Sequence, residues 1–263
     1  MSQTHPSEQK QLQTTPELTI AGRIATIRFR NPAYANRLSP SDLDVIKEHL
    51  IVVNQNEEVL VLRFIADGKY FCSGYDISSL AAESAPSSTY FGDTVDLIET
   101  ARPITIAAIQ GGVYGGGTDL SLACDFRLGV PQANMFMPAT RLGLHFYPGG
   151  MVRYITRLGL NNAKKLFLTS QKIEAQEMLD IGFLTEILEQ EQLLVRLDQL
   201  SEQLAGMAPL ALIGIKKHMN LIARGIVDDE AIRAAVAISE KSNDIKEGAL
   251  AWKEKRAARF TGT

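Results

Sequence analysis

Two glycine-containing segments of this chain could present backbone N–H groups to a common point. One is Ser73-Gly74-Tyr75, and the other is the run Gly115-Gly116-Gly117. Each lies where an apolar stretch gives way to a loop and then to a helical pattern. Amide donors from two separate loops could clamp one carbonyl oxygen and stabilise it as it becomes an anion. A tight turn without a ligand would explain either segment alone, but the pair together favours an oxyanion site built from the main chain.

Buried strands and short helices are predicted to position these two segments. A strand leads into each loop, and in open α/β layers ligands bind beyond the carboxyl ends of strands. Ser39 and Pro40 are typical of a helix start. The pattern predicts a β-hairpin at 18–29, a helix from Ser39, strands at 59–64 and 104–109, helices at 90–100 and 117–123, and strands at 126–129 and 133–137.

From Pro148 onward the sequence is mostly helical. Ala208-Pro209 predicts a break between two longer helices, because the residue before a proline is pushed out of the helical region. Helices are predicted at 151–158, 161–168, 175–181, 189–207, 209–223, 228–242 and 246–260, with a short strand at 184–188.

The bulk composition limits the class of protein. The chain has 263 residues, of which 45% are apolar and 22% charged, as is ordinary for a soluble protein with one sizeable core. A net charge of −3 attracts neither nucleic acid nor an anionic membrane, so neither is expected as a partner. The polar N-terminus is not a secretory signal, no apolar stretch of about 18 residues is present, and Cys72 and Cys124 indicate no disulfide framework. A cytoplasmic location is the default prediction.

Four segments in a fixed order carry a specific resemblance. Together they are similar to the crotonase superfamily, that is, the enoyl-CoA hydratase/isomerase family, over about residues 17–260. The segments are Phe71-Cys72-Ser73-Gly74-Tyr75-Asp76-Ile77; Gly115-Gly116-Gly117-Thr118-Asp119-Leu120 with Ala123-Cys124-Asp125; Arg141-Leu142-Gly143 with Gly149-Gly150; and Asp244-Ile245-Lys246-Glu247-Gly248 with Trp252-Lys253-Glu254-Lys255-Arg256.

The resemblance implies an α/β fold, a crotonase-like spiral of ββα units with a helical C-terminal trimerisation region. The expected division is a flexible N-terminal tail at residues 1–16, the spiral core at 17–200 and the trimerisation region at 201–263. It also implies a homotrimer or a dimer of trimers. The implied substrate is an acyl-CoA thioester, with no additional cofactor.

The resemblance assigns chemical roles at the glycine segments. The amides of Tyr75 and Gly116 match the family's two oxyanion donors, and Gly116 has no side chain to block the approach. Asp119 matches a position where many members carry a Glu that acts as acid or base, although Asp is one methylene shorter. The alternative for Asp119 is a carboxylate that merely stabilises a helix start.

Ala139 stands where the family carries its second catalytic Glu. Hydration of an enoyl thioester usually uses two carboxylates, so this residue argues against simple hydratase activity. One acid/base group can still move a proton between two carbons, as a double-bond isomerase requires. Loss of the second group also fits a decarboxylase or hydrolase, whose enolate forms without removal of a C–H proton.

Two side chains after Ala139 depart from the family's usual small residues. Tyr147 and His145 could each donate a proton or orient a substrate carboxylate. The alternative is aromatic packing at a helix start. Both are therefore candidate catalytic residues beside Asp119.

The resemblance also places CoA contacts. Ser73 and Gly74 match positions that bind CoA in the family, and Trp252 and Lys255 match C-terminal positions that contact CoA, often from a neighbouring subunit. The four histidines have no metal-ligand spacing, so no metal site is expected.

The favoured interpretation is an enzyme that isomerises a double bond in an acyl-CoA, with Asp119 moving the proton. The first alternative is a decarboxylase or hydrolase of a carboxylated or β-keto acyl-CoA that uses Tyr147. The second alternative is a protein that binds acyl-CoA without converting it.

Overall fold

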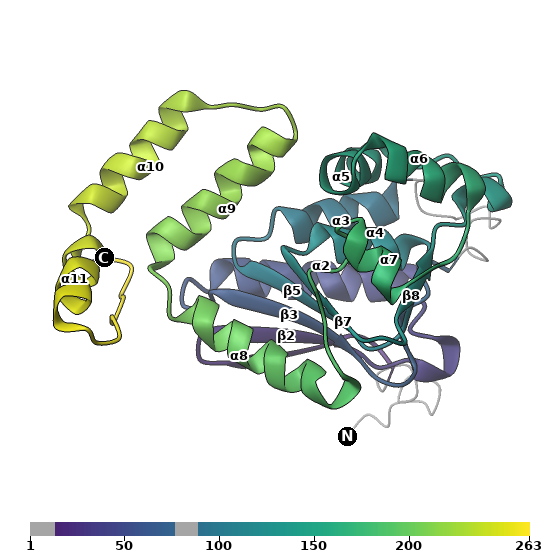
Figure 1. Cartoon of the computed structure of the whole chain (residues 1–263), viewed down its shortest axis with the longest axis horizontal. Coiled ribbons are helices and arrows are strands. Elements are labelled where there is room, and N and C mark those ends of the chain that lie inside the picture. The colour runs from purple at the N-terminus through teal and green to yellow at the C-terminus, as the bar shows by residue number, and fades with distance from the viewer. Residues whose placement is uncertain (1–13, 77–88) are drawn as a thin grey trace, which may run out of the picture.

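The computed structural model describes residues 14–76 and 89–263, so most of the predicted N-terminal tail and Ile77 of the first motif lie outside it. Two sheets form the centre of the molecule (Figure 1). The larger runs in the order β1-β2-β3-β5-β7-β10, and the smaller in the order β4-β6-β8-β9. The strands are β1 (Glu17–Ala21), β2 (Ile24–Phe29), β3 (Val61–Ala66), β4 (Tyr70–Cys72), β5 (Ile104–Ile109), β6 (Gly112–Tyr114), β7 (Phe126–Gly129), β8 (Asn134–Phe136), β9 (Ile173–Glu174) and β10 (Glu186–Ile187).

Local sequence signals explain the first elements. The predicted hairpin is confirmed, since β1 and β2 pair antiparallel from Glu17–Arg28 to Ala21–Ile24. Helix α2 (Pro40–Gln55) begins with a capping box, in which Ser39 and Asp42 each accept a hydrogen bond from the other's backbone N–H. Its apolar face is buried at Leu43, Ile46, Leu50 and Val53.

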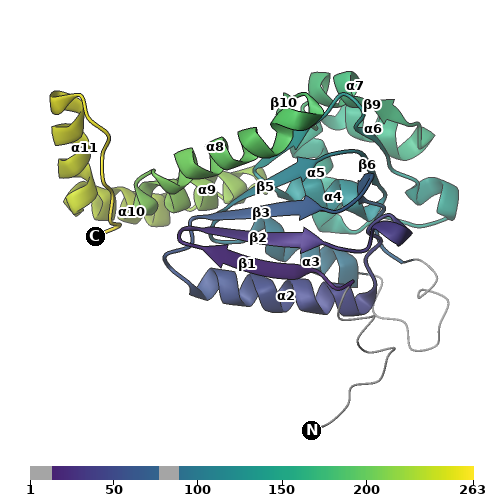
Figure 2. The ribbon, with the colours of Figure 1, turned by 90° about the horizontal axis from the view of Figure 1, so that it is seen from below.

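Helices cover both faces of the larger sheet. Figure 2 shows α8 (Leu193–Ala205) along one face and α2 with α3 (Tyr90–Glu99) on the other. Helix α8 packs on β2, β3, β5 and β7 through the buried side chains of Leu193, Leu197 and Leu200. The helices α4 (Gly116–Ala123), α5 (Pro148–Leu158), α6 (Leu160–Thr169) and α7 (Ala175–Asp180) continue the body.

Three helices at the C-terminus extend away from this body (Figure 1). They are α9 (Pro209–Ala223), α10 (Asp229–Lys241) and α11 (Asn243–Glu254). We call α9–α11 the C-terminal arm. It exposes many large apolar side chains, among them Ile215, Met219, Ile222, Val227, Val236, Ile238 and Trp252.

The last predicted helix was wrong at both ends. Helix α11 begins at Asn243 because the Ser242 side chain accepts a hydrogen bond from the Ile245 N–H, and it ends at Glu254 because Lys255 adopts a left-handed conformation with φ 53°. The chain then turns back, and Arg256 pairs with Glu247 at 2.6 Å. The predicted helix at 189–207 is likewise a short 3₁₀ turn followed by α8, and the strand at 184–188 shortens to β10.

The smaller sheet gathers the segments that the sequence marked for chemistry. Strand β6 pairs in parallel with β4 on one side and with β8 on the other. Parallel neighbours end at the same edge of a sheet. The loops after Cys72, Tyr114 and Phe136 therefore meet at one edge.

Candidate active site

The two glycine loops touch at this edge. Gly74 has φ +95°, and a Cβ built on it would lie only 2.8 Å from the Gly116 nitrogen. A side chain there would force the loops apart, and a left-handed φ is costly for any residue but glycine. Glycine at 74 is therefore what lets the chain place Tyr75 next to Gly116.

The amides of Tyr75 and Gly116 are free to bind a ligand. Tyr75 forms a parallel bridge with Leu38, in which Leu38 N–H donates to the Gly74 oxygen at 2.8 Å and Asp76 N–H donates to the Leu38 oxygen at 2.9 Å. The Tyr75 N–H thus points away from Leu38. Gly116 is the first residue of α4, where an N–H has no acceptor within the helix. Neither amide donates to an acceptor within residues 14–76 and 89–263.

Asp119 lies one turn into α4 and is fully buried. The Arg153 guanidinium holds it bidentately, with Nε donating to Oδ1 at 2.9 Å and Nη2 to Oδ2 at 2.7 Å. The Tyr147 hydroxyl also donates to Oδ2, at 2.6 Å. Both carboxylate oxygens are thus engaged, and Tyr147 is the partly exposed end of this group.

Tyr147 is fixed in place by its surroundings. It is the residue directly before α5, its ring stacks on Phe146 with centroids 4.2 Å apart, and a Cβ on Gly92 would lie 2.5 Å from the ring. Burial and the negative charge of Asp119 raise the pKa of Tyr147 well above 10. The pair therefore rests as a neutral phenol that donates to a carboxylate.

Sequence reasoning missed Arg153. This side chain is fully buried on α5, and besides Asp119 it contacts Asp96 at 2.5 Å and Glu99 at 3.2 Å. Burial alone would lower its pKa, but the hydrogen bonds and charge of Asp119 outweigh burial and raise it. A signal was present, because Arg153 follows Gly149 and Gly150 at the helical spacing that points toward the body.

Aromatic side chains enclose the space beside the two amides. The Tyr75 and Phe91 rings lie 5.7 Å apart, and a Cβ on Gly116 would meet Phe91 at 2.6 Å. Phe91 is buried, with 6% of its surface exposed. The Tyr75 hydroxyl oxygen is buried and has no hydrogen-bond partner within the described part of the chain. A bound polar group could satisfy it.

Ala139 lies beside the same loops. It is buried at the start of a short 3₁₀ turn (Ala139–Leu142), and its neighbour Pro138 sits 3.7 Å from the position of a Cβ on Gly115. The loop after β8 thus brings a methyl group to this edge, where the sequence resemblance expected a carboxylate.

His145 takes no part in the group around Asp119. It is exposed, and its Nδ1 lies 2.9 Å from the neighbouring Phe146 oxygen. Ser73 lies in the first loop, where its N–H donates to the Ala35 oxygen at 3.0 Å. Cys72 is fully buried, and burial raises the pKa of its thiol to about 12, which leaves no thiolate for nucleophilic attack.

Trp252 and Lys255 lie far from these loops. Both views place α11 at the opposite end of the molecule from α4–α6 (Figures 1 and 2). Trp252 is 88% exposed, and Lys255 caps the C-terminus of α11. Within one chain the predicted contact of these two residues with a CoA held at Gly74 is not formed.

In the part of the chain that the structure describes, no helix is both long and apolar enough to cross a bilayer. Within the same residues, no group of three or more His, Cys, Asp or Glu side chains could hold a metal ion.

Comparison with known proteins finds one family across the chain. The sequence model of the enoyl-CoA hydratase/isomerase family matches residues 19–263. A crotonyl-CoA hydratase from Syntrophomonas wolfei is 30% identical over 245 residues, which cover 90% of this chain and 94% of the relative. A carnitinyl-CoA dehydratase from Proteus mirabilis is 28% identical, with coverages of 93% and 97%.

Solved structures agree with the predicted fold. An enoyl-CoA hydratase from Bacillus anthracis superposes with a TM-score of 0.86 at 26% identity and covers 95% of this chain and 100% of its own. An enoyl-CoA hydratase/isomerase family protein from Hyphomonas neptunium gives a TM-score of 0.87, also at 26% identity, with coverages of 94% and 98%. The predicted crotonase-like α/β fold is thereby confirmed.

Proposed function

Because this chain belongs to the enoyl-CoA hydratase/isomerase family, we propose that it binds an acyl-CoA thioester and stabilises its enolate with the Tyr75 and Gly116 amides. The two free N–H groups at touching loops support this assignment. The dipole of α4 adds positive potential at the same point. Each such donor removed from an oxyanion hole costs about 2.7–4 kcal/mol of transition-state stabilisation.

Tyr147 is the proton donor in this proposal. The observation that carries it is the 2.6 Å hydrogen bond to an Asp119 whose two oxygens are already held by Arg153. A fully buried carboxylate in a bidentate ion pair is a poor base for a substrate C–H bond, because protonation would break the pair. Tyr147 is the member of the group that a substrate can reach, and its hydroxyl carries a proton.

A phenol can protonate an enolate that has formed without C–H removal. Decarboxylation supplies such an enolate: the electrons of the Cα–carboxylate bond pass into the thioester and CO₂ leaves. The Tyr147 proton then goes to Cα, and a proton from solvent returns to the Tyr147 oxygen after CO₂ has left. The geometry therefore favours a decarboxylase of a carboxylated acyl-CoA over a hydrolase, which also requires an activated water.

Double-bond isomerisation, which the sequence favoured, becomes the second candidate. Asp119 lies in the same group, so a relay in which Tyr147 passes a proton to it is geometrically open. The relay requires Tyr147 to act as a base, and its raised pKa keeps it protonated. Hydration is the activity named for the relatives, and Ala139 leaves this chain without the second carboxylate expected for it.

An oligomer completes the CoA site in this proposal. The exposed apolar side chains of the C-terminal arm support the homotrimer or dimer of trimers, since such surfaces mark protein contacts. Trp252 and Lys255 would then reach CoA on a neighbouring subunit, with Ser73 and Gly74 from the subunit that holds the acyl group. A cytoplasmic location and the absence of nucleic-acid partners remain predictions.

The test compares Tyr147→Phe with Asp119→Asn on two substrates. Malonyl-CoA and a 3-enoyl-CoA are incubated with each variant, and products are identified by mass spectrometry. We expect malonyl-CoA to lose CO₂, and Tyr147→Phe to lower kcat by at least ~10², more than Asp119→Asn does. Tyr114→Phe, which alters a different phenol of the smaller sheet, is the matched control.

Other outcomes identify the alternatives. Turnover of only the 3-enoyl-CoA, with Asp119→Asn the more damaging change, would establish the isomerase. Binding of both thioesters without conversion would indicate a non-catalytic acyl-CoA-binding protein.

A further inference from the structure

A network of buried charges runs from Asp119 to the C-terminal arm. Glu99 is its centre: Arg153 donates to it at 3.2 Å, Arg157 lies 3.8 Å from it, and Arg224 donates to it through Nε at 2.9 Å. Arg153 and Arg224 also share Asp96, at 2.5 and 3.1 Å. The charged and titratable groups around Asp119 come from two helices and from residues that flank helices: Asp96 and Glu99 of α3, Arg153, Tyr154 and Arg157 of α5, Arg224 directly after α9, and Tyr147 directly before α5.

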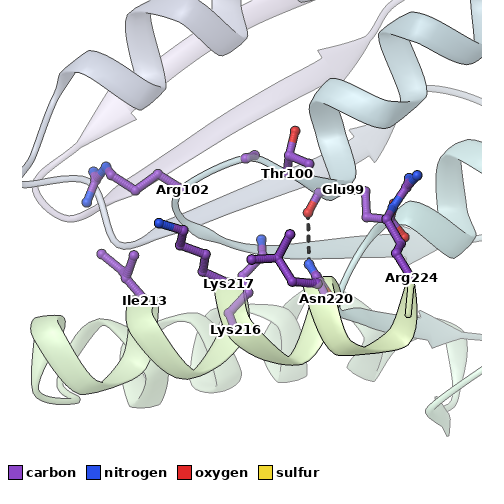
Figure 3. Close-up of a pocket in the computed structure, with 10 residues that line it drawn as sticks. Glu99, Thr100, Arg102, Ile213, Lys216, Lys217, Asn220 and Arg224 are labelled. Carbon is purple, nitrogen blue, oxygen red and sulfur yellow. Dashed lines mark hydrogen bonds and ion pairs between the residues drawn. The ribbon is translucent and has the colours of Figure 1, made fainter. Parts of the chain in front are cut away.

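Arg224 is the only one of the three arginines in this network that comes from the arm. It follows α9 directly and reaches across to the end of α3 (Figure 3). Two more contacts hold α9 against the body. Asn220 donates to the Glu99 backbone oxygen at 3.0 Å, and Lys216 donates to the Pro103 oxygen at 2.5 Å.

The balance of charge in this network allows a change at Arg224 to affect Asp119, which Arg224 does not contact. Three carboxylates, Asp96, Glu99 and Asp119, face three guanidinium groups. Glu99 has a side chain only 7% exposed, so it cannot turn to water if Arg224 is removed. Its remaining cations are Arg153, whose Nη1 already donates to it at 3.2 Å, and the more distant Arg157 at 3.8 Å.

A stronger attraction between Glu99 and Arg153 would weaken the ion pair between Arg153 and Asp119. The Arg153 Nη1 donates hydrogen bonds to Asp96 and Glu99, while its Nε and Nη2 donate to Asp119. Movement toward Glu99 would stretch the bidentate pair, and the uncompensated charge would lower the positive potential at Asp119. Asp119 orients the Tyr147 hydroxyl, so the disturbance reaches the proposed proton donor.

We propose that Arg224 is a positioning residue, which acts through Glu99 and Arg153 to hold Asp119 aligned with Tyr147. The packing of α9 against the body would thereby influence the position of Asp119 in the active site. The inference rests on the proposed function, in which the Tyr147–Asp119 pair handles the proton.

The first experiment measures the kcat and KM of malonyl-CoA turnover in Arg224→Gln and Arg224→Lys. In Arg224→Gln, kcat should fall about tenfold, the size typical of coupling along such networks, with KM within about threefold. Arg224→Lys should restore part of the lost kcat. Arg233→Gln, which removes an exposed ion pair of α10, is the control expected to match the wild type.

The second experiment needs no substrate. Urea unfolding is compared for Arg224→Gln, Asp119→Asn and the double variant. Arg224 and Asp119 share no direct contact, so their effects on the midpoint add unless Arg153 couples them. We expect a clearly non-additive midpoint. Additive midpoints overturn the inference, as does a folded Arg224→Gln with the wild-type kcat.

A third variant tests the inference in the case that Arg224→Gln fails to fold. If Arg224→Gln does not fold, Glu99→Gln/Arg224→Gln removes the charge that Arg224 balances, and it should recover both folding and most of the wild-type kcat. Recovery of neither overturns the inference. The result for Tyr147→Phe separates the two proposals: full activity in that variant rejects the proposed function, whereas an inactive Tyr147→Phe beside a wild-type-like Arg224→Gln rejects only the role of Arg224.

Discussion

The two halves of the candidate site are held in place by different kinds of interaction. The amide half, Tyr75 and Gly116, is main chain fixed by the parallel pairing of β4 and β6 and by the left-handed Gly74. The side-chain half, Tyr147 and Asp119, comes from α4 and the start of α5 and depends on a buried arginine. Backbone donors do not titrate and need only the local geometry. The side-chain half depends on ion pairs and hydrogen bonds between distant residues, which the network around Arg153 supplies.

The largest effect is expected from breaking the side-chain half at Arg153. Arg153→Met leaves Asp119 buried without its counter-charge, so the free energy of unfolding should fall by about 3–5 kcal/mol. Urea unfolding measures it. Arg233→Met, which breaks an exposed pair, should change stability by less than about 1 kcal/mol. Equal losses in the two variants would mean that the buried pair does not stabilise the site.

Breaking the amide half should lower activity more than it lowers stability. Gly74→Ala places a Cβ 2.8 Å from the Gly116 nitrogen and separates the two donors, so kcat should fall by at least ~10². Gly22→Ala is the matched control, because Gly22 also has a positive φ, +56°, but has open space around it. A kcat for Gly74→Ala equal to that of the control would contradict the oxyanion assignment.

A smaller effect, on the pH dependence of kcat, also distinguishes the two halves. Asp119 raises the pKa of Tyr147, so replacing its charge in Asp119→Asn should lower that pKa, although burial still raises it. The alkaline limb of kcat should therefore move to lower pH than in the wild type. Affinity for a non-reactive acyl-CoA should stay unchanged between pH 8 and 10. An unmoved limb would exclude Tyr147 as the proton donor.

The smallest effect is expected at Cys72. This thiol lies in the amide half and accepts from the Gly74 N–H at 3.4 Å, and its pKa of about 12 keeps it protonated. Cys72→Ser retains an acceptor, so kcat/KM should stay within about threefold of the wild type. A loss beyond ~10² would instead assign the thiol a chemical role.

The sequence singled out candidate site residues one by one, but it did not reveal the contacts between them. It marked Tyr75, Gly116, Asp119 and Tyr147 separately, and the structure brings Tyr147 onto Asp119. Neither that hydrogen bond nor Arg153 was predicted, because residues 28 and 34 positions apart meet only through helix packing. His145 shows the opposite error: its residue type suited catalysis, but its side chain is exposed.

Elements with strong local signals were also predicted best. The hairpin β1–β2 and the capped helix α2 follow from alternation and a capping box. The last helix was wrong because its limits depend on Ser242 as a cap and on the left-handed Lys255, neither of which apolar periodicity reveals.

The sequence by itself determined the fold and the amide half of the site, since glycine placement and strand pattern act over a few residues. Only the tertiary structure decided the state of the side-chain half. Burial of Asp119 with Arg153, and of Glu99 with Arg224 from the distant arm, depends on charges that meet in a region from which water is largely excluded. Such electrostatics depend on distance and burial in space, and residue order along the chain specifies neither.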